Sequence, residues 1–569
     1  MKMFPTMGGS SLVLICLMYF TGLVAAQDSN ITIPLNKSIT YENKELYGSY
    51  LTLNGESHVR VDFSNVNKSL YFLVFQAHSY MSSITLNMTN KYGTSVVMGT
   101  NLGLVIFTDE ISTVNVLSDN KNVTVRVYIS VHGYEKNDPI PGGCNMELPV
   151  NIAPFLTTLT FPDYVLVEVG APSAPATDRT CITPLQADMT FYMMYLSEQN
   201  FYSEPYFNGL RTLMTLEGIK KYGKEIPFIS IPYTRRRLSA YPGTGAIYAV
   251  VATSKNFTNK DNLTAYSVYV PNYSYGCNEF DEDSCEMIDD WLSQILCLGL
   301  MITGLFICFF GHRFFKTEMF FAGFFSGVII SYILIALVTV VDKPALLPAA
   351  TVSGIFFGGI WWLFWWLYGI PVLAVLLPSL NLGFLLASIF YYRLPGNIPY
   401  LASDFNFWTL FILVMLLTAL AVFSVSYAAN IICCAVLGAF ATVLALDYYM
   451  GSNLKFIIIN VIRRATVPSF NQAFIAPPDT QWRDVAVAVM WLLLGTLGFL
   501  FQHWYNRGRP PFPPPPRSVR PSISEPSTFS YGAISSYFRR RPTNQQGTVV
   551  GSVTPIIARP YTERTGLLS

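Results

Sequence analysis

The side chains that could do chemistry are few, and their spacing excludes the common enzyme sites. The 569-residue chain has five histidines, His58, His78, His132, His312 and His503. A membrane-embedded zinc hydrolase needs several His or acidic side chains close together to bind the metal and activate water. No G-x-S-x-G motif and no glycine-rich phosphate-binding loop occurs either. The sequence therefore predicts a protein that is not an enzyme and needs no cofactor.

Four cysteines have a spacing that favours disulfide bonds. Cys16 lies in an N-terminal apolar run, and four more cysteines lie in apolar segments after residue 290. The other four are Cys144, Cys181, Cys277 and Cys285. They allow three connectivities, of which we favour pairing sequence neighbours, Cys144 with Cys181 and Cys277 with Cys285. A zinc site is the alternative, but no C-x-x-C motif or nearby His supports it.

The acceptor sites for N-glycosylation are distributed on one side of the chain. Eight N-x-S/T sequons occur before residue 290 and none after it. This asymmetry predicts that residues 27–290 face the secretory lumen or the cell exterior. The predicted sites are Asn30, Asn36, Asn67, Asn87, Asn122, Asn256, Asn262 and Asn272.

The N-terminus agrees with this compartment. Residues 1–26 contain Lys2, an apolar run and a small-residue cleavage site, which is the layout of a cleavable signal peptide. An uncleaved membrane anchor is the alternative. We therefore exclude these residues from the fold.

Charge and hydropathy then divide the rest of the chain. Residues 27–290 hold 18 Lys/Arg against 27 Asp/Glu, residues 291–502 are largely apolar, and residues 503–569 hold nine Lys/Arg against two acids. The overall net charge of +1 sums regions in different compartments, so it says nothing about partners. We expect contact with membrane lipid and no nucleic-acid partner.

Seven apolar segments are long enough to cross a bilayer as helices, for which about 20 residues are needed. Seven crossings place the tail, residues 503–569, in the cytosol, where its excess of Arg agrees with the positive-inside rule. The tail is rich in Pro, Ser and Arg, which predicts disorder. The predicted spans are 291–310, 319–341, 347–367, 371–391, 405–427, 429–449 and 485–502.

A short polar stretch, GHRFFKTE at residues 311–318, interrupts the apolar sequence after the first span. Its polar residues could form a site, or they could be a water-exposed turn between two spans. Arg313 and Lys316 are the anchoring charges expected at a cytosolic turn, so we favour the turn. His312 is then an interfacial residue rather than a proton-linked switch.

Two polar residues lie within later spans and form a possible intramembrane polar site, because burying polar groups in lipid is costly. They are Asn381 and Asp447, and we expect water and headgroups to reach the second. Between the last two spans, residues 451–484 predict an amphipathic helix and loop on the outer face. The outer position of Arg463 and Arg464 runs against the charge bias.

The region before the spans has the pattern of β-structure. Residues 122–134, NVTVRVYISVHGY, alternate apolar and polar side chains, as half-buried strands do. We predict two antiparallel β-sandwich modules, 27–140 and 150–276, with a helical segment near 206–222. We interpret Arg235–Arg237 as a solvated loop rather than a processing site. The modules would bind an unknown lumenal or extracellular protein or glycan partner.

The chain as a whole is thus predicted to be a multi-domain membrane protein, an all-β lumenal region followed by an α-helical seven-transmembrane bundle at 291–502. Its tail ends in ERTGLLS, where Glu563 precedes Leu567 and Leu568 as in an acidic dileucine sorting signal read by clathrin adaptors. This predicts a protein of the cell membrane that cycles to endosomes or lysosomes.

Seven spans also raise the question of a G-protein-coupled receptor. The rhodopsin-like acid-Arg-aromatic triplet and Asn-Pro-x-x-Tyr motif are absent, and the corresponding places read WWLYGIP and LLLGTLGFLFQHWYN. An unconventional G-protein-coupled receptor, one without these two motifs, is therefore one alternative. A transporter or channel formed by the spans is another.

Several motifs together suggest a family. PIPGGCN ending at Asn145, YGCN around Cys277, ICFFGHRFFKTE at 307–318, RGRPPFPPPP at 507–516 and the final ERTGLLS resemble the transmembrane seven superfamily member three family. The resemblance implies a multi-pass membrane protein associated with cell survival, attenuation of the unfolded-protein response and secretion. It implies no catalytic residues.

Overall fold

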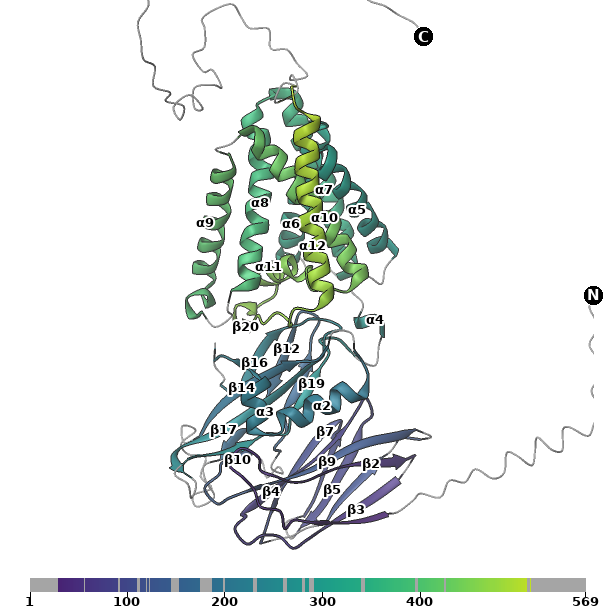
Figure 1. The fold of residues 1–569 in the computed structure, drawn as a ribbon, viewed down its shortest axis with the longest axis vertical. Coiled ribbons are helices and arrows are strands. Elements are labelled where there is room, and N and C mark those ends of the chain that lie inside the picture. The colour runs from purple at the N-terminus through teal and green to yellow at the C-terminus, as the bar shows by residue number, and fades with distance from the viewer. Residues whose placement is uncertain are drawn as a thin grey trace, which may run out of the picture. The chain divides into compact units, whose positions relative to one another are not determined.

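Strands and long helices occupy separate parts of the chain in the computed structural model (Figure 1). Most strands precede residue 275, and the long apolar helices follow Trp291. The predicted fold class, β-sandwich modules followed by a seven-helix bundle, is confirmed. The structure describes residues 29–508 and Phe512, apart from gaps at 56, 91–92, 110–112, 119, 122, 145–152, 174–186, 198–199, 229–232, 259–262, 279–281, 286–290, 339–342, 395–397, 424–425 and 509–511.

The first β module is an open sandwich of two sheets, with strand orders β1-β3-β8-β5-β6 and β2-β9-β4-β7. Inward-facing Val, Leu and Ile side chains of both sheets form one buried cluster, as the alternating pattern predicts. One pairing differs from the antiparallel prediction, because β1 runs parallel to β3. The strands are β1 (Ser29–Pro34), β2 (Glu45–Asn54), β3 (Ser57–Ser64), β4 (Phe72–Ser79), β5 (Ile84–Asn90), β6 (Gly93–Gly99), β7 (Asn101–Phe107), β8 (Val114–Ser118) and β9 (Thr124–Tyr134).

The second β module also contains two larger sheets, with orders β11-β12-β16-β20 and β15-β14-β17-β18, and β19 pairs with β17. A small third sheet joins β10 to β13. A buried apolar cluster lies between the larger sheets. The strands are β10 (Ile140–Cys144), β11 (Thr157–Thr160), β12 (Tyr164–Glu168), β13 (Ala171–Ser173), β14 (Ala187–Tyr195), β15 (Lys224–Ile226), β16 (Arg235–Ser239), β17 (Ala246–Thr258), β18 (Thr264–Val268), β19 (Asn272–Ser274) and β20 (Ala473–Phe474).

The predicted helical segment is present as two short helices, α2 (Ser203–Leu213) and α3 (Leu216–Tyr222). Buried apolar residues of α2 recur at helical spacing, so one face of the helix is apolar. This face packs against β17, β18 and Tyr128 of β9 in one cluster. The helices therefore fill the junction between the two modules.

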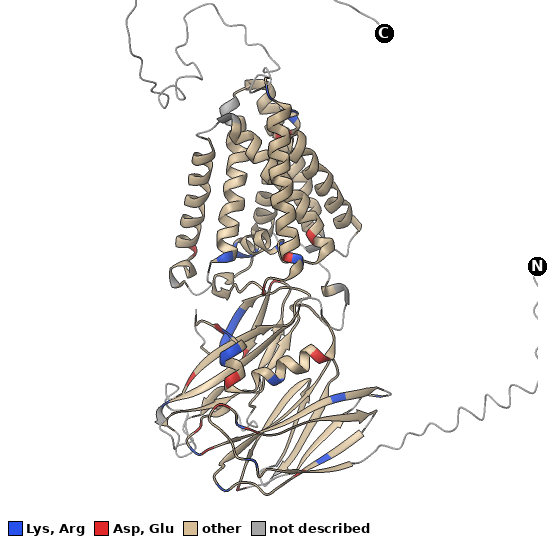
Figure 2. Cartoon of the chain, in the orientation of Figure 1, with Lys and Arg blue, Asp and Glu red and all other residues tan. Residues whose placement is uncertain are grey.

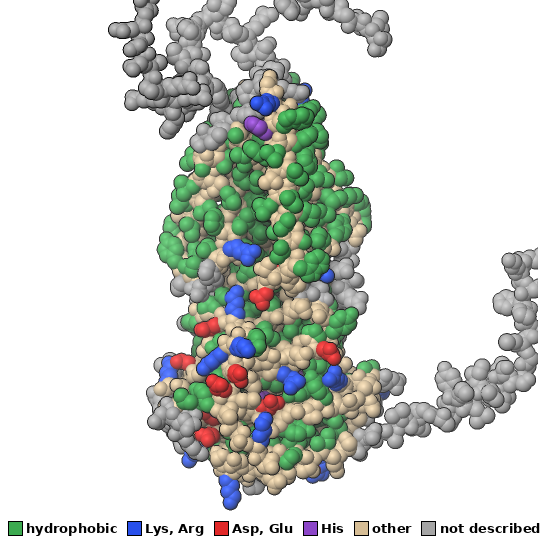
Figure 3. All heavy atoms as spheres, viewed as in Figure 1, with side chains coloured by type: hydrophobic (Ala, Val, Ile, Leu, Met, Phe, Trp, Pro, Cys, Tyr) green, Lys and Arg blue, Asp and Glu red, His purple; other side chains and the backbone are tan. Residues whose placement is uncertain are grey.

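Seven described helices are long and apolar enough to cross a membrane, in agreement with the seven predicted spans. Their surfaces expose many Leu, Ile, Val and Phe side chains, which suits contact with lipid tails (Figure 3). The long helices are α5 (Trp291–Phe310), α6 (Phe315–Val338), α7 (Lys343–Tyr368), α8 (Pro371–Arg393), α9 (Asp404–Phe423), α10 (Ser426–Met450) and α12 (Trp482–Tyr505). Shorter elements are α4 (Glu282–Cys285), η1 (Pro399–Ala402), α11 (Phe456–Thr466) and η2 (Phe470–Gln472).

Small residues bring α6 and α7 close together. A Cβ atom placed on Gly323 would lie 3.1 Å from the Cα atom of Gly358, and one on Gly327 would lie 3.2 Å from the Cα atom of Gly354. Side chains larger than hydrogen would push the two backbones apart. The glycine spacing thus sets the distance between these helices.

One expectation about a single segment is wrong. Arg235–Arg237 belong to strand β16 rather than to a solvated loop, and Arg236 is buried with its guanidinium 4.3 Å from the Phe191 ring centre. Near the end of α7, the indole of Trp365 is also covered, because it is buried against Phe315. In both places tertiary neighbours cover a side chain that looks solvent-facing in sequence.

Candidate functional site

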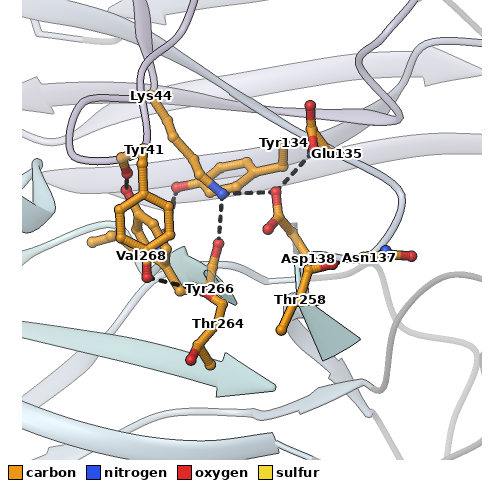
Figure 4. A network of polar contacts seen from close by, with 10 residues as sticks. All are labelled: Tyr41, Lys44, Tyr134, Glu135, Asn137, Asp138, Thr258, Thr264, Tyr266 and Val268. Atoms are coloured by element: carbon orange, nitrogen blue, oxygen red, sulfur yellow. Dashed lines mark hydrogen bonds and ion pairs between the residues drawn. The ribbon is translucent and has the colours of Figure 1, made fainter. Parts of the chain in front are cut away.

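The two β modules are joined by a buried ion pair. Lys44 Nζ lies 2.7 Å from Asp138 Oδ2, with both side chains almost completely buried. Lys44 Nζ also donates to the Tyr266 carbonyl at 2.9 Å, and it lies 4.2 Å from the Tyr266 ring centre. Figure 4 shows the ammonium between this ring, Tyr134 and Asp138. Since Tyr266 belongs to β18 of the second module, the pair links the modules.

Burial shifts the pKa of both members of this ion pair. Removal from water lowers the pKa of Lys44 and raises the pKa of Asp138, and each partner opposes that effect on the other. The carboxylate accepts a second hydrogen bond at 2.7 Å from the Glu135 backbone N–H. A buried pair of this kind tolerates little displacement, because loss of one partner leaves an unpaired buried charge.

A second polar network runs through the sheet of the first module. The Gln76 amide lies between two imidazoles, 3.1 Å from His132 Nδ1 and 3.2 Å from His78 Nε2. His78 Nδ1 lies 2.6 Å from Asn101 Oδ1, which also accepts from the Tyr206 hydroxyl at 2.8 Å. Because Tyr206 is on α2, this network also reaches the second module.

The imidazoles in this network are kept neutral by their surroundings. Burial lowers the pKa of His78 to about 4 and the pKa of His132 to about 3. Neither histidine is placed near enough to acids or cysteines to form a metal site in the described part of the chain. Their arrangement is that of a neutral hydrogen-bonded core.

The segment between the last two long helices joins the second module to the helices. Strand β20 pairs in parallel with β16, placing Arg237 beside Ala473 and Leu238 beside Phe474 (Figure 1). Phe474 enters the buried core of the module. The Tyr195 hydroxyl of β14 donates to the Ala476 carbonyl at 2.5 Å. A loop of the helical half therefore completes a β-sheet of the other half.

Arg463 on α11 is the polar centre of this contact. One guanidinium nitrogen donates to the Ala240 carbonyl at 2.7 Å, and the other donates to the Pro162 carbonyl at 3.1 Å. Its Nε lies 3.4 Å from Asp163 Oδ1, and its side chain is 5% exposed. The Ser239 hydroxyl, beside Ala240, donates to Asn460 Oδ1 one turn earlier on α11 at 2.9 Å.

Arg464 points to a different neighbour. Its guanidinium lies 2.8 Å from Asp404 Oδ1 at the start of α9 and 4.8 Å from the Phe407 ring centre. Arg463 and Arg464, whose position on the outer face runs against the positive-inside rule, thus both have nearby carboxylate and carbonyl partners. In Figure 2 charged residues gather in the β modules and at the helix ends beside them, whereas the middle of the bundle is almost entirely tan.

The two polar residues predicted to form an intramembrane site do not lie together. Asp447 is fully buried, which corrects the expectation of contact with water, and it accepts hydrogen bonds from the Ser452 hydroxyl and the Lys455 backbone N–H. Asn381 accepts from the Ser326 hydroxyl at 2.7 Å and donates to the Ala322 carbonyl at 3.2 Å. The first residue organises the turn after α10, and the second bridges α8 to α6.

The turn at 311–318 contains a buried polar cluster that the sequence interpretation missed. His312 and Glu318 are buried, although Arg313 is exposed as expected. The Asn430 amide on α10 lies 3.0 Å from His312 Nδ1 and donates to Glu318 Oε2 at 2.9 Å. Gln502 on α12 accepts from the His312 backbone N–H at 3.1 Å. The polar stretch is therefore partly a turn and partly a site.

A sequence signal for this cluster exists in hindsight. Glu318 is the single acid in the helix Phe315–Val338, and an isolated acid beginning an apolar helix is costly unless it has a role. Asn430 similarly stands near the start of α10 among apolar residues. What could not be anticipated is that helices far apart in sequence bring the two side chains into contact.

The sequons differ in their surroundings. Asn30, Asn36 and Asn67 are exposed, whereas Asn87 and Asn272 are half-buried. The Asn272 side chain donates to the Leu156 carbonyl at 2.9 Å and accepts from the Asn101 amide at 3.0 Å. Asn122 and Asn262 lie outside the described residues, as does the side chain of Asn256.

The cysteines and the tail complete the predicted sites. Cys277 and Cys285 form the predicted disulfide bond. Cys144 is disulfide-bonded, and Cys181 lies outside the described residues. The sorting residues Glu563, Leu567 and Leu568 also lie outside them, so the dileucine signal stays a prediction.

Comparisons with known families cover nearly all of the described chain. Residues 39–134 match the TM7SF3-like, N-terminal immunoglobulin-like domain, and residues 139–280 match the TM7SF3-like, second immunoglobulin-like domain. Residues 297–503 match the TM7S3/TM198-like domain. These three matches correspond to the first β module, the second β module and the bundle.

Curated relatives agree with these matches. The chain is 31% identical over 488 residues to Transmembrane 7 superfamily member 3 of Homo sapiens, covering 82% of this chain and 83% of the relative. It is 30% identical over 485 residues to the Mus musculus protein of the same name, covering 82% and 84%. With two immunoglobulin-like modules, seven apolar helices and this similarity along its length, the chain belongs to the Transmembrane 7 superfamily member 3 family.

Proposed function

We propose that this chain is a non-enzymatic, glycosylated membrane protein that binds a protein or glycan partner on its β modules and transmits that binding to the seven-helix bundle. The observation that carries the proposal is the joint between module and bundle, where β20 pairs with β16 and Arg463 binds carbonyl groups of the second module. A module held by backbone pairing and a buried cation moves together with α11. Partner binding would therefore displace the ends of the helices next to it.

The proposed orientation places the β modules in the secretory lumen or outside the cell and the tail in the cytosol. The one-sided sequons and the Cys277–Cys285 disulfide support this orientation, because both modifications belong to the secretory pathway. We further propose a cytoprotective role, meaning support of cell survival and secretion and attenuation of the unfolded-protein response. The family resemblance is what suggests this role.

Cells that lack the protein provide the test. Re-expression of the full chain should restore survival when lumenal calcium is depleted, whereas Arg463→Ala should restore much less at equal abundance. The matched control is Arg313→Ala, a change at an exposed arginine in the turn between α5 and α6, and this variant should act as the full chain does. Equal rescue by the Arg463 variant would show that transmission through this joint is not needed.

The tail signal has its own test. Changing Leu567 and Leu568 to Ala should raise the surface abundance of the protein, because clathrin adaptors would no longer recognise the leucine pair. Surface biotinylation measures this, with Ser569→Ala as the control. An unchanged distribution would remove the sorting role and leave the proposed partner binding unaffected.

A further inference from the structure

The described bundle contains two buried carboxyl groups, Asp447 and Glu318, and their surroundings differ in a way that points to a ligand. Asp447 has a cation nearby, since Lys455 Nζ lies 3.9 Å from its Oδ2. Its two oxygens also accept from the Ser452 hydroxyl and the Lys455 backbone N–H. Asp447 is therefore satisfied by its neighbours.

Glu318 has no such compensation within the part of the chain that the structure describes. Its side chain is 4% exposed, and its Oε2 accepts from the Asn430 amide at 2.9 Å. Its Oε1 has no nitrogen or oxygen donor, and the neighbouring Cys434 thiol is only a weak donor, while Asn430 Oδ1 has no hydrogen-bond partner. Two buried acceptor atoms in one cluster thus lack a strong donor, which is costly in an apolar environment.

A small cavity lies beside Glu318. It has a volume of about 40 Å³ and is lined by side chains of α5, α6, α8 and α10, including Asn381 and Cys434. A volume of roughly 10–15 Å³ suffices for the centre of one water molecule, so the cavity can hold water beside the carboxyl group. The cavity supplies room for a small ligand next to the unpartnered oxygens.

The groups that face Glu318 carry little opposing charge. From α10, Cys433 and Cys434 line the cavity. On α5, Cys308 directly follows the cavity-lining residue Ile307. From α8, Pro378 and Asn381 line the cavity, and neither of these two side chains titrates. His312 is connected to Glu318 through the Asn430 amide, which lies within hydrogen-bond distance of His312 Nδ1. Gln502 of α12 accepts a hydrogen bond from the His312 backbone N–H. Arg313 and Lys316 of the turn are exposed. No described Lys or Arg forms an ion pair with Glu318.

A charged carboxylate in this position would be expensive, and a proton removes the charge. Protonation also converts one oxygen into an O–H donor, which is what the cluster lacks. A metal cation would need several oxygen ligands to replace its hydration shell. The Asn381 oxygen is already engaged by Ser326 at 2.7 Å, so the cluster offers too few free oxygens.

We propose that Glu318 is a reversible proton-binding site inside the bundle, positioned by Asn430 and His312. The proton is held on the carboxyl group, and the cavity is its route of exchange with water. Asn430 fixes the carboxyl group through Oε2, and His312 fixes the Asn430 amide. The inference does not depend on partner binding by the β modules.

A lipid-soluble carbodiimide tests the site, because it reacts with protonated carboxyl groups in apolar surroundings. The full chain in lipid vesicles is treated with dicyclohexylcarbodiimide at several pH values, and the labelled peptides are identified by mass spectrometry. Labelling of Glu318 should be highest at the lowest pH and should fall at least about tenfold as the pH is raised and the proton is lost. Asp447 should be labelled much less than Glu318, because the Ser452 hydroxyl, the Lys455 backbone N–H and the Lys455 ammonium already hold its carboxyl group.

Further conditions separate the alternatives. Suppression of labelling by Na⁺ or K⁺ would overturn the proposal in favour of a metal-cation site. Equal labelling of Asp447, or no labelling of Glu318 at low pH, would also overturn the proposal.

Asn430→Ala should shift the pH midpoint of Glu318 labelling. If Asn430 had only a structural role, this midpoint would stay unchanged. The melting temperature of Glu318→Gln should depend less on pH than that of the natural chain, with Asp447→Asn as the control for folding. Equal pH dependence in Glu318→Gln would count against the proposal.

Discussion

At the scale of single residues, burial decides which polar groups matter in this protein. His78 and His132 are fully enclosed in the first β module and share the Gln76 amide. Such an enclosed imidazole is favoured in its neutral form, because no carboxylate of the described residues acts on either ring to compensate a positive charge. The two histidines therefore link the stability of the module to pH.

The first prediction concerns acid. The folded pKa of each histidine, about 4 for His78 and about 3 for His132, is below the usual value of 6.5. Their stabilising contribution is complete above that value and is lost as the pH falls from about 6.5 toward the folded pKa. Between pH 7 and pH 5 each histidine should cost about 2 kcal/mol of folding free energy.

Thermal unfolding followed across this pH range measures the effect. His78→Gln should flatten the pH dependence even if it lowers the melting temperature at neutral pH. The control is His58→Gln in the same module, which should keep the natural slope. A melting temperature that does not change between pH 7 and pH 5 would contradict the prediction.

The second prediction concerns the buried Lys44–Asp138 ion pair, which belongs to the first module and contacts Tyr266 of the second. Lys44→Ala or Asp138→Ala should each destabilise the protein by about 3–5 kcal/mol, because the remaining charge is left buried and unpaired. Combining Lys44→Met with Asp138→Leu should cost much less than the sum of the single changes.

An exposed pair in the same module provides the control for these variants. Arg60 and Asp62 are 52% and 39% exposed, so Arg60→Ala should change stability by less than about 1 kcal/mol. Chemical denaturation measures all four variants. If the double variant were as unstable as the sum of its parts, the pair would not act as a unit.

At the scale of elements, the segment α11 to β20 is the feature that joins the two halves of the fold. Its amphipathic helix was predictable from sequence, but its role was not. A parallel two-residue pairing is short, and it is supported by Phe474 in the module core and by the hydrogen bonds of Arg463. The element therefore depends on few contacts.

The third prediction follows from this dependence. Arg463→Ala leaves the Ala240 and Pro162 carbonyls and Asp163 without their donor, and each buried acceptor left unpaired costs about 1–3 kcal/mol. The β16 and β20 amides should then exchange hydrogen with solvent at least about tenfold faster. Hydrogen exchange with mass spectrometry measures this.

The exchange experiment has an internal reference. Strands β4 and β9 lie in the other module, and their amides should exchange at the natural rate in the same variant. Arg463→Lys should give an intermediate effect, since an ammonium keeps the charge but not the two-sided geometry. Unchanged exchange in β16 would show that strand pairing alone holds the joint.

At the scale of the whole molecule, surface chemistry divides the chain. Apolar side chains dominate the visible face of the bundle, and charged side chains gather on the β modules (Figure 3). This division is what a protein partly in lipid and partly in water requires. Glycosylation should follow the same division.

The fourth prediction concerns which sequons carry glycans. Asn36 and Asn67 are exposed and should be occupied. Asn272 should not be occupied, because its half-buried side chain is held between the Leu156 carbonyl and the Asn101 amide and leaves little room for a glycan. Enzymatic deglycosylation of protein made in cells, followed by mass spectrometry, reports each site. Occupied Asn272 or a chain without any glycan would contradict the prediction.

Properties set by local composition could be read from the sequence. Hydropathy located the seven long helices, and the alternation of apolar and polar residues located strands such as Thr124–Tyr134. In the folded chain only Thr124–Val127 alternate in burial, and the rest of this strand is buried on both faces. The Cys277–Cys285 disulfide was also accessible, since the two residues are only eight positions apart.

Pairings between distant residues needed the folded chain. Lys44 meets Asp138 across 94 positions, Glu318 meets Asn430 across 112, and Arg463 meets Pro162 across 301. In sequence, His312 and Glu318 look like parts of an exposed turn, and the two arginines look misplaced. Whether a polar side chain is solvated, paired or left with a free oxygen depends on which elements pack around it, and neither hydropathy nor spacing encodes that.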